Sequence, residues 1–145
     1  MNNLQWSDAY SVGIPAIDFQ HKRIFDCLVS ILGGPTDGDK LRAEAEVIKL
    51  LGLLQQHFAV EESMMRKLCY PEIEQHIEEH RRFNADVHEV AQKSLRTKGG
   101  VSRDAIEIAH RWLTEHIATS DRDYAAFFLN PAHESGNTKS VRTCG

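Results

Sequence analysis

The chain has 145 residues, of which 41% are hydrophobic and 26% are charged. These values are ordinary for a globular protein, and a single domain of this size buries roughly 70% of the surface of its unfolded chain. The formal net charge of −4 predicts no nucleic-acid partner, because nucleic-acid-binding surfaces are usually basic. No run of about 18 apolar residues occurs, which predicts no membrane insertion.

Cysteine usage and the first residues indicate a cytoplasmic protein. Cys27, Cys69 and Cys144 are odd in number and far apart, which is a poor framework for disulfides and fits a reducing compartment. Cys27 and Cys69 are predicted to be small core residues. Residues 1–10 contain neither a basic cluster nor an apolar run, so we expect no export signal.

The first half of the chain predicts an extended arm and two helices. Residues 1–16 have no helical period, so this arm is expected to pack its aromatic residues on the rest of the protein. A helix is predicted from about Asp18, its expected N-cap, to the turn formers at 33–38. A second helix is predicted from residue 39 or 40 to Leu68. Its predicted core side consists of Leu41, Ala45, Ile48, Leu51, Leu54, Phe58, Met65 and Leu68.

The second half predicts two more helices and a tail. Pro71 stops the second helix and starts a third, because proline is tolerated in a first turn and disfavours helix in the residue before it. The third helix is expected to end near residue 97. Ser102 is the predicted N-cap of a fourth helix that ends near Leu129. Residues 131–145 are polar and aperiodic, so a flexible tail is expected there.

Four helices joined by short loops, with no alternating strand pattern, predict an all-α fold. The expected architecture is an antiparallel up-down-up-down four-helix bundle with an extended N-terminal arm. Residues 1–130 are predicted to form this bundle, and residues 131–145 the tail.

Each predicted helix places at least one possible metal ligand on its inward face. These residues are His21, His57, Glu61, His76, His80, His116 and Asp121. Burying imidazoles and carboxylates without partners is costly, so a metal is the favoured explanation. Five imidazoles and two carboxylates exceed a four-coordinate site, which indicates two metal ions bridged by the carboxylates. Ligand type alone does not choose among iron, copper, nickel and zinc.

Asp121 does not fit this pattern on a regular helix. A separation of five positions from His116 turns the helix by about 500°, which leaves Asp121 roughly 140° away. Ser120 would face inward instead. Either Asp121 is a surface residue, or a one-residue π-bulge turns it toward the other candidates.

The segments that carry these residues resemble the ligand motifs of the hemerythrins, in particular the bacterial single-domain kind. They are Ile17-Asp18-Phe19-Gln20-His21-Lys22, His57-Phe58-x-x-Glu61-Glu62-x-x-Met65, His76-x-x-x-His80 and Trp112-Leu113-x-x-His116-Ile117-x-x-x-Asp121. The motifs follow in the family's order and fill all of its ligand positions. The resemblance covers about residues 4–129.

The resemblance implies a non-haem di-iron site that binds dioxygen reversibly, in an oxygen-binding protein rather than an enzyme. The implied cofactors are two iron ions (Fe2+/Fe3+) with a bridging oxo or hydroxo group. The implied ligands of one iron are His76, His80 and His116. Those of the other, which keeps an open position, are His21 and His57. Glu61 and Asp121 would bridge both irons. The residues that match the family's oxygen pocket are Phe58, Trp112, Leu113 and Ile117.

Other functions are compatible with parts of this pattern. The segment His76-Ile77-Glu78-Glu79-His80 satisfies the H-x-x-E-H pattern of a group of zinc peptidases, but it leaves the remaining candidate ligands without a role. The full set could also serve a di-iron oxidase or peroxidase, or an oxygen- or redox-sensing module. Dioxygen is the expected small ligand, and an oxygen-using enzyme or a signalling protein is the expected protein partner. A bundle with buried histidines and no metal is the remaining interpretation.

Overall fold

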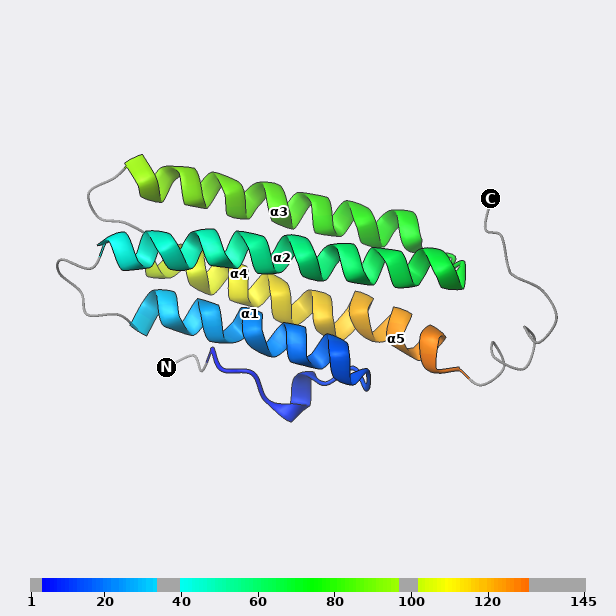
Figure 1. Cartoon of the computed structure of the whole chain (residues 1–145). Helices are drawn as coiled ribbons and strands as arrows, with labels where there is room; N and C mark the ends of the chain where they lie inside the picture. Colours follow the sequence, from blue (N-terminus) through cyan, green and yellow to red (C-terminus); the bar gives the residue numbers. More distant parts are fainter. Residues whose placement is uncertain (1–3, 34–39, 97–101, 131–145) are drawn as a thin grey trace.

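A computed structural model describes residues 4–33, 40–96 and 102–130 (Figure 1). Within these ranges the chain is helical apart from the arm and short connections, and it contains no strand. The first three long helices are α1 (Pro15–Gly33), α2 (Lys40–Leu68) and α3 (Ile73–Arg96). The fourth consists of α4 (Arg103–His116), the π-helical turn η2 (Ile117–Asp121) and α5 (Arg122–Leu129) in direct succession. A 3-10 helix, η1 (Asp8–Tyr10), lies in the arm.

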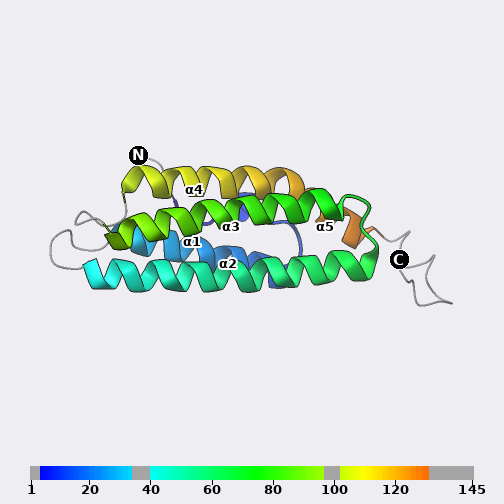
Figure 2. The same ribbon diagram turned by 90° about the horizontal axis from the view of Figure 1, so that it is seen from above.

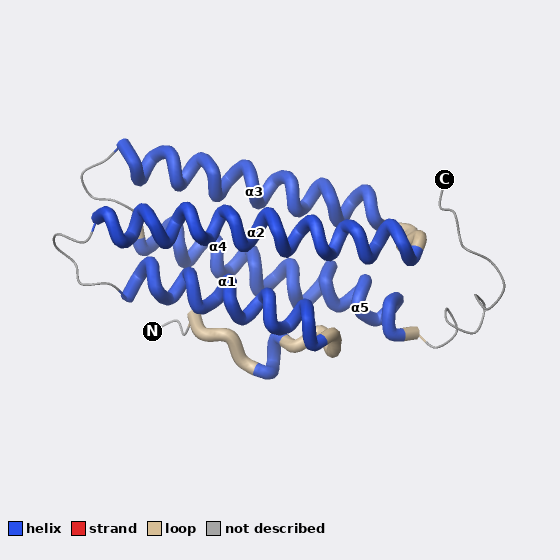
Figure 3. Tube along the Cα trace, viewed as in Figure 1, coloured by secondary structure: helices blue, strands red, loops and turns tan. Residues whose placement is uncertain are grey.

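The four long helices form the predicted antiparallel bundle. In Figure 1, α1 and α3 run in one direction and α2 and α4 in the other, with α5 continuing α4. Helix α1 packs against α2 and α4, and α3 packs against the same two helices. Seen from above, α1 and α3 therefore lie diagonally across the bundle (Figure 2). The arm follows the outside of α1, where it is drawn as a tan loop (Figure 3).

The first helix begins earlier than predicted. It starts at Pro15, a residue whose fixed φ and missing N–H suit the first helical turn. Asp18 is therefore not the N-cap. Its carboxylate accepts hydrogen bonds from the Ser11 hydroxyl at 2.5 Å and from the Val12 backbone N–H at 2.9 Å. These bonds attach the arm to the first turn of α1.

The core side of α2 differs from the prediction in its first half. Val47 and Leu50 are buried, whereas Ile48 is 63% exposed and Ala45 is also exposed. Adjacent apolar pairs such as Val47 and Ile48 fit a helical period in either of two registers, so only packing against the neighbouring helices decides between them. Further along the helix the predicted residues Leu54, Phe58 and Met65 are buried.

The other helix boundaries agree with the sequence more closely. The Ser102 side chain accepts a hydrogen bond from the Ala105 backbone N–H at 3.1 Å, which confirms the predicted N-cap of α4. Cys27 is a buried core residue as predicted. Cys69, by contrast, is half-buried, has a φ of 55° and is disulfide-bonded. Cys69 is therefore not the small core residue that the sequence predicts, and the expectation of a poor disulfide framework does not hold for it.

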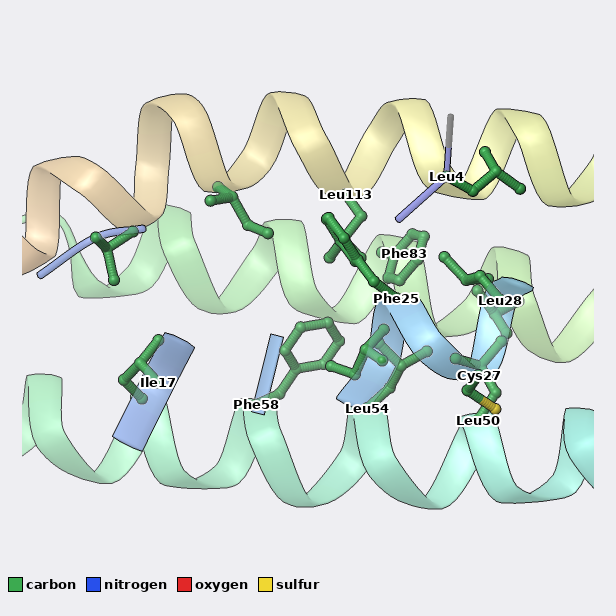
Figure 4. Close-up of a cluster of buried hydrophobic side chains, with 14 of the residues drawn as sticks. Leu4, Ile17, Phe25, Cys27, Leu28, Leu50, Leu54, Phe58, Phe83 and Leu113 are labelled. Carbon is green, nitrogen blue, oxygen red and sulfur yellow. The ribbon is translucent and has the colours of Figure 1, made fainter. Parts of the chain in front are cut away.

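The interior of the bundle is apolar along most of its length. Figure 4 shows Leu50, Leu54 and Phe58 following one another along α2, with Phe83 of α3 and Leu113 of α4 between the helices. No described helix is long and apolar enough to cross a membrane. Cys144 and the predicted tail, residues 131–145, lie outside the described residues.

Candidate metal centre

The seven candidate ligands meet in the interior of the bundle. Their exposed fractions are 0% for His21, Glu61 and Asp121, 2% for His57, His76 and His80, and 4% for His116. Within the described ranges they are the only buried polar or charged residues. Buried ionisable groups are expensive unless they are paired, hydrogen-bonded or bound to a metal. Their collection at one place therefore indicates a single polar site inside an apolar bundle.

The donor atoms form two groups that share both carboxylates. One group contains Glu61, His76, His80, His116 and Asp121, and the other contains His21, His57, Glu61 and Asp121. Within each group the donor atoms lie within 4.8 Å of one another. This arrangement can hold two cations side by side with Glu61 and Asp121 between them.

Each of the five histidines directs its Nε2 atom toward one of the two carboxylates. The Nε2 atoms of His21, His76 and His116 lie 3.2, 3.0 and 3.1 Å from oxygens of Asp121, and those of His57 and His80 lie 3.3 and 3.2 Å from Oε1 of Glu61. The Nδ1 atoms are left to face the surrounding shell. All five rings therefore present the same nitrogen, Nε2, to the same pair of carboxylates.

The buried atoms at the centre lack hydrogen-bond partners. No hydrogen bond reaches the Nε2 atom of His21, His57, His76, His80 or His116, both oxygens of Glu61, or both oxygens of Asp121. A buried polar atom without a partner costs about 1–3 kcal/mol, so nine such atoms in one place need a common ligand. Imidazole nitrogens together with carboxylate oxygens form a donor set that suits iron and other transition metals. The residues present therefore fit a metal centre.

The π-helical turn η2 brings Asp121 into the centre. It covers Ile117–Asp121, between two regular helical segments. The wider turn confirms the π-bulge and excludes the alternative in which Asp121 lies on the surface. Ser120, which would face inward on a regular helix, is displaced outward and donates hydrogen bonds to the Glu79 carboxylate at 2.7 and 2.8 Å.

Two of the histidines are oriented by hydrogen bonds to side chains outside the centre. Nδ1 of His57 lies 2.7 Å from Oε1 of Gln20, and Nδ1 of His80 lies 2.9 Å from Oε2 of Glu62. Such contacts fix the tautomer and ring orientation of metal-binding histidines. The sequence makes Glu62 a candidate acceptor for a histidine N–H group, but it does not pair Gln20 with His57 or Glu62 with His80, because residues 37 and 18 positions apart meet only in the folded bundle.

Glu79 occupies a similar place beside a third histidine. Its Oε1 lies 3.6 Å from Nδ1 of His116, and its carboxylate is held by Ser120. Glu79 is also the glutamate of the H-x-x-E-H pattern. It faces Nδ1, the far side of the His116 ring from the Nε2 donor.

The charges at the centre shift the pKa values of its members. Burial favours the neutral form of Glu61, but the neighbouring histidines, His57 foremost, outweigh it and hold the pKa of Glu61 well below 4.5. Burial lowers the pKa of His76, but the close carboxylates of Asp121 and Glu61 raise it overall to about 9. Without a metal, His76 is therefore protonated at neutral pH. A cation bound by this nitrogen must displace the proton.

Apolar side chains cover the centre. The ring of Phe58 is stacked on His80, with centroids 3.9 Å apart and planes at 13°, and Trp112 is stacked on His116 at 4.7 Å and 10°. Leu113 and Ile117 are 1% and 0% exposed. The four residues predicted for the oxygen pocket thus lie on helical segments that also carry the candidate ligands.

Comparison with known proteins agrees with this geometry. A family model described as "Hemerythrin HHE cation binding domain" matches residues 12–128. A bacteriohemerythrin from Stenotrophomonas maltophilia is 31% identical over 124 residues, which cover 84% of this chain and 79% of that protein. A bacteriohemerythrin from Pseudomonas paraeruginosa is 33% identical over 127 residues, covering 86% of this chain and 80% of that protein.

Less similar proteins also match the chain. A myohemerythrin from Theromyzon tessulatum is 28% identical over 120 residues, which cover 83% of this chain and 89% of that protein. The crystal structure of a wild-type hemerythrin superimposes with a TM-score of 0.79 at 24% identity, covering 87% of this chain and 98% of that one. The family match spans most of the bundle and all seven buried polar residues. The chain therefore belongs to the hemerythrin family.

Proposed function

We propose that the centre holds two iron ions (Fe2+/Fe3+) with a bridging oxo or hydroxo group and binds dioxygen reversibly, for transport, storage or delivery. The observation that carries this proposal is the division of the donor atoms into two groups that share Glu61 and Asp121. When bound, the iron pair would supply the electrons for reversible oxygen binding and the coordination position at which it occurs.

The ligands divide unequally between the two ions. His76, His80 and His116 would hold one ion, and His21 and His57 would hold the other. Glu61 and Asp121, which belong to both groups, would be shared between the ions. The second group contains one histidine fewer than the first. An ion held there would keep one more position for an external ligand, which is the asymmetry that an oxygen-binding site needs.

The surrounding polar residues keep the histidines ready to bind metal. Gln20 and Glu62 accept hydrogen bonds from the Nδ1–H groups of His57 and His80 when the Nε2 atoms act as ligands. Partners of this kind raise the basicity of a metal-binding imidazole and fix its direction. These two hydrogen bonds join α1 to α2 and α2 to α3, so they also tie the centre to the correct packing of the bundle.

The apolar cover favours oxygen binding over oxygen chemistry. Phe58, Leu113 and Ile117 are each at most 5% exposed. Apolar side chains beside the centre limit the access of water and protons, and both would be needed to convert bound oxygen to released products. This supports an oxygen-binding protein over a di-iron oxidase or peroxidase. An oxygen-using enzyme or a signalling protein is the expected recipient.

Metal analysis combined with anaerobic spectroscopy tests the proposal. The protein is loaded with Fe2+ without air, and its absorption spectrum is followed through exposure to oxygen and subsequent removal of oxygen. About two irons per chain and an absorption band that appears with oxygen and disappears on deoxygenation are expected. A preference for zinc with no oxygen-dependent band would contradict the proposal. A band that decays only as an added reductant is consumed would favour the oxidase or peroxidase.

A further inference from the structure

An apolar cavity lies beside the centre, between α2, α3 and α4. Its volume is about 90 Å³. Val47 of α2, Val87 of α3, and Ile106 and Ala109 of α4 are among the residues that line it, and Asp86 is the only charged one. None of the candidate ligands reaches this cavity, so the metal centre does not account for it.

The lining of the cavity determines what can occupy it. A water molecule needs about 10–15 Å³ and two to four polar partners, and apolar cavities large enough for several waters stay dry and accept small apolar molecules. Asp86 is exposed, as is Ile108, which also lines the cavity. These two residues therefore mark its solvent side, while Ile106, with 3% exposure, lies at its inner side.

Two aromatic residues separate the cavity from the centre. Phe83 and Trp112 both line the cavity and stack on each other, with centroids 3.9 Å apart and planes at 3°. Trp112 stacks in turn on His116, and Phe83 contacts Phe58 edge to face at 6.2 Å. Figure 4 shows Phe83 and Leu113 between Phe58 and Leu50, which lines the far end of the cavity. The wall of the cavity is thus also the cover of the centre.

We propose that this cavity is an antechamber for dioxygen, which passes from it to the centre between Phe83, Trp112 and Leu113. The inference rests on the proposed function and adds the route by which the ligand arrives. Dioxygen is small and apolar, so it partitions from water into such a cavity. The stacked aromatic pair gives way by side-chain motion, and water, which lacks polar partners along this path, is held back.

A second hollow offers the competing route. It lies between α2 and α3, has a volume of about 320 Å³ and is lined by Phe58, Ala59 and His80 together with the charged Glu62 and Arg81. Charged walls attract water, so this hollow suits solvent better than a dry gas path. Alanines that can be enlarged line both hollows, Ala105 and Ala109 in the cavity and Ala59 in the competing hollow.

Oxygen kinetics of two matched variants separate the routes. Ala109→Leu fills the cavity, and Ala59→Leu narrows the competing hollow. Association and dissociation rate constants are measured by stopped flow and flash photolysis on the iron-loaded protein. Ala109→Leu is expected to lower both constants by the same factor, about tenfold, which corresponds to a barrier about 1.4 kcal/mol higher. The dissociation constant stays unchanged because the bound state is not touched, and Ala59→Leu behaves like the wild type.

Xenon binding provides a readout that does not depend on iron. Xenon is expected in the cavity of the wild-type protein, by NMR of dissolved xenon or in pressurised crystals, and to be excluded from Ala109→Leu. Ala105→Leu fills the same cavity from the preceding turn of α4 and replaces Ala109→Leu should that variant fail to fold. Unchanged rate constants in the cavity-filling variant, or slowing by Ala59→Leu instead, would overturn the antechamber. A wild-type protein that takes up no oxygen would overturn the proposed function, while its xenon binding could still be measured.

Discussion

Oδ1 of Asp121 lies 3.1 Å from Nε2 of His116 although five positions separate the two residues on one continuous helical segment. On a regular helix these side chains would point roughly 140° apart. The π-helical turn between them removes this difference, and π-turns are frequent at functional sites. Asp121 can thereby face four histidines and one glutamate from the other helices as well as His116.

Replacement of Asp121 tests its role as a bridge. Asp121→Ala is expected to lower the iron content from about two per chain to at most one, because both groups of donor atoms lose a shared ligand. Metal analysis after loading and desalting measures the loss. The control is Asp123→Asn, an exposed carboxylate two positions away, which should retain full loading. An Asp121→Ala protein that still holds two irons would exclude the bridging role.

Because Glu62 accepts a hydrogen bond from His80, replacing Glu62 is expected to weaken metal binding without abolishing it. Glu62→Leu removes the acceptor that orients Nδ1 of His80, and loss of such a partner typically costs about 10–100-fold in affinity. Competition with a chelator of known affinity measures the change. Glu78→Gln is the matched control, since this exposed carboxylate pairs only with Arg81 and Arg82 among the described residues. Equal affinities for both variants would refute an orienting role for Glu62.

Leu113 is predicted to protect the oxygenated state. Leu113→Asn places an amide in the 1% exposed cover of the centre, which admits water and should accelerate irreversible oxidation. The rate of decay of the oxygen-dependent absorption band measures this. Leu113→Met keeps an apolar side chain of similar volume and should decay like the wild type. Identical decay rates in the two variants would show that the apolar side chain of Leu113 does not protect the oxygenated state.

The buried thiol of Cys27 is expected to make folding stability depend on pH whether or not metal is bound. Burial, together with the nearby Glu46, raises the pKa of the Cys27 thiol to about 12 from 9.0. The thiol ionises at a lower pH in the unfolded chain than in the folded protein. Its contribution to the free energy of unfolding is therefore fully present below about pH 9 and is lost as the pH rises toward 12. The difference in melting temperature between the wild type and Cys27→Ala should narrow over this range. A constant difference would contradict the shift.

The reactivity of the same thiol gives a second measurement. Since the thiolate is the reacting form, iodoacetamide at pH 8.5 should label Cys27 far more slowly in the native protein than in the unfolded chain. Peptide mapping by mass spectrometry isolates Cys27 from the other cysteines. Equal labelling rates would show that the site is open to reagent and ionised.

Local spacing in the sequence was sufficient to predict the bundle and six of the seven residues that meet at the centre. The reason is that an α-helix converts a separation of four residues into a common face, so His57 with Glu61 and His76 with His80 had to point together. A polar residue on an inward, otherwise apolar helix face costs free energy to bury. Each such residue is therefore a candidate ligand.

The tertiary structure decided the features that depend on contacts between helices. The inward face of the first half of α2 was ambiguous because Val47 and Ile48 are both apolar. In the folded bundle Val47 is buried and Ile48 is exposed. The sequence could not pair Gln20 with His57 or Glu62 with His80, because in each pair the two residues lie on different helices. The cavity beside Trp112 is a space left between three helices, which no one-dimensional pattern encodes.

The role of Asp121 depends on both the sequence and the tertiary structure. Its residue type and its place in the motif mark it as a candidate in the sequence, yet the helical rule that identifies the other six would turn it to the surface. Only the folded bundle, in which Ser120 bonds to Glu79 on the outside and Asp121 faces the buried histidines, favours the wider turn. Local spacing therefore determines which residues can be ligands of the centre. Packing between the helices decides that Asp121 faces the centre rather than the solvent.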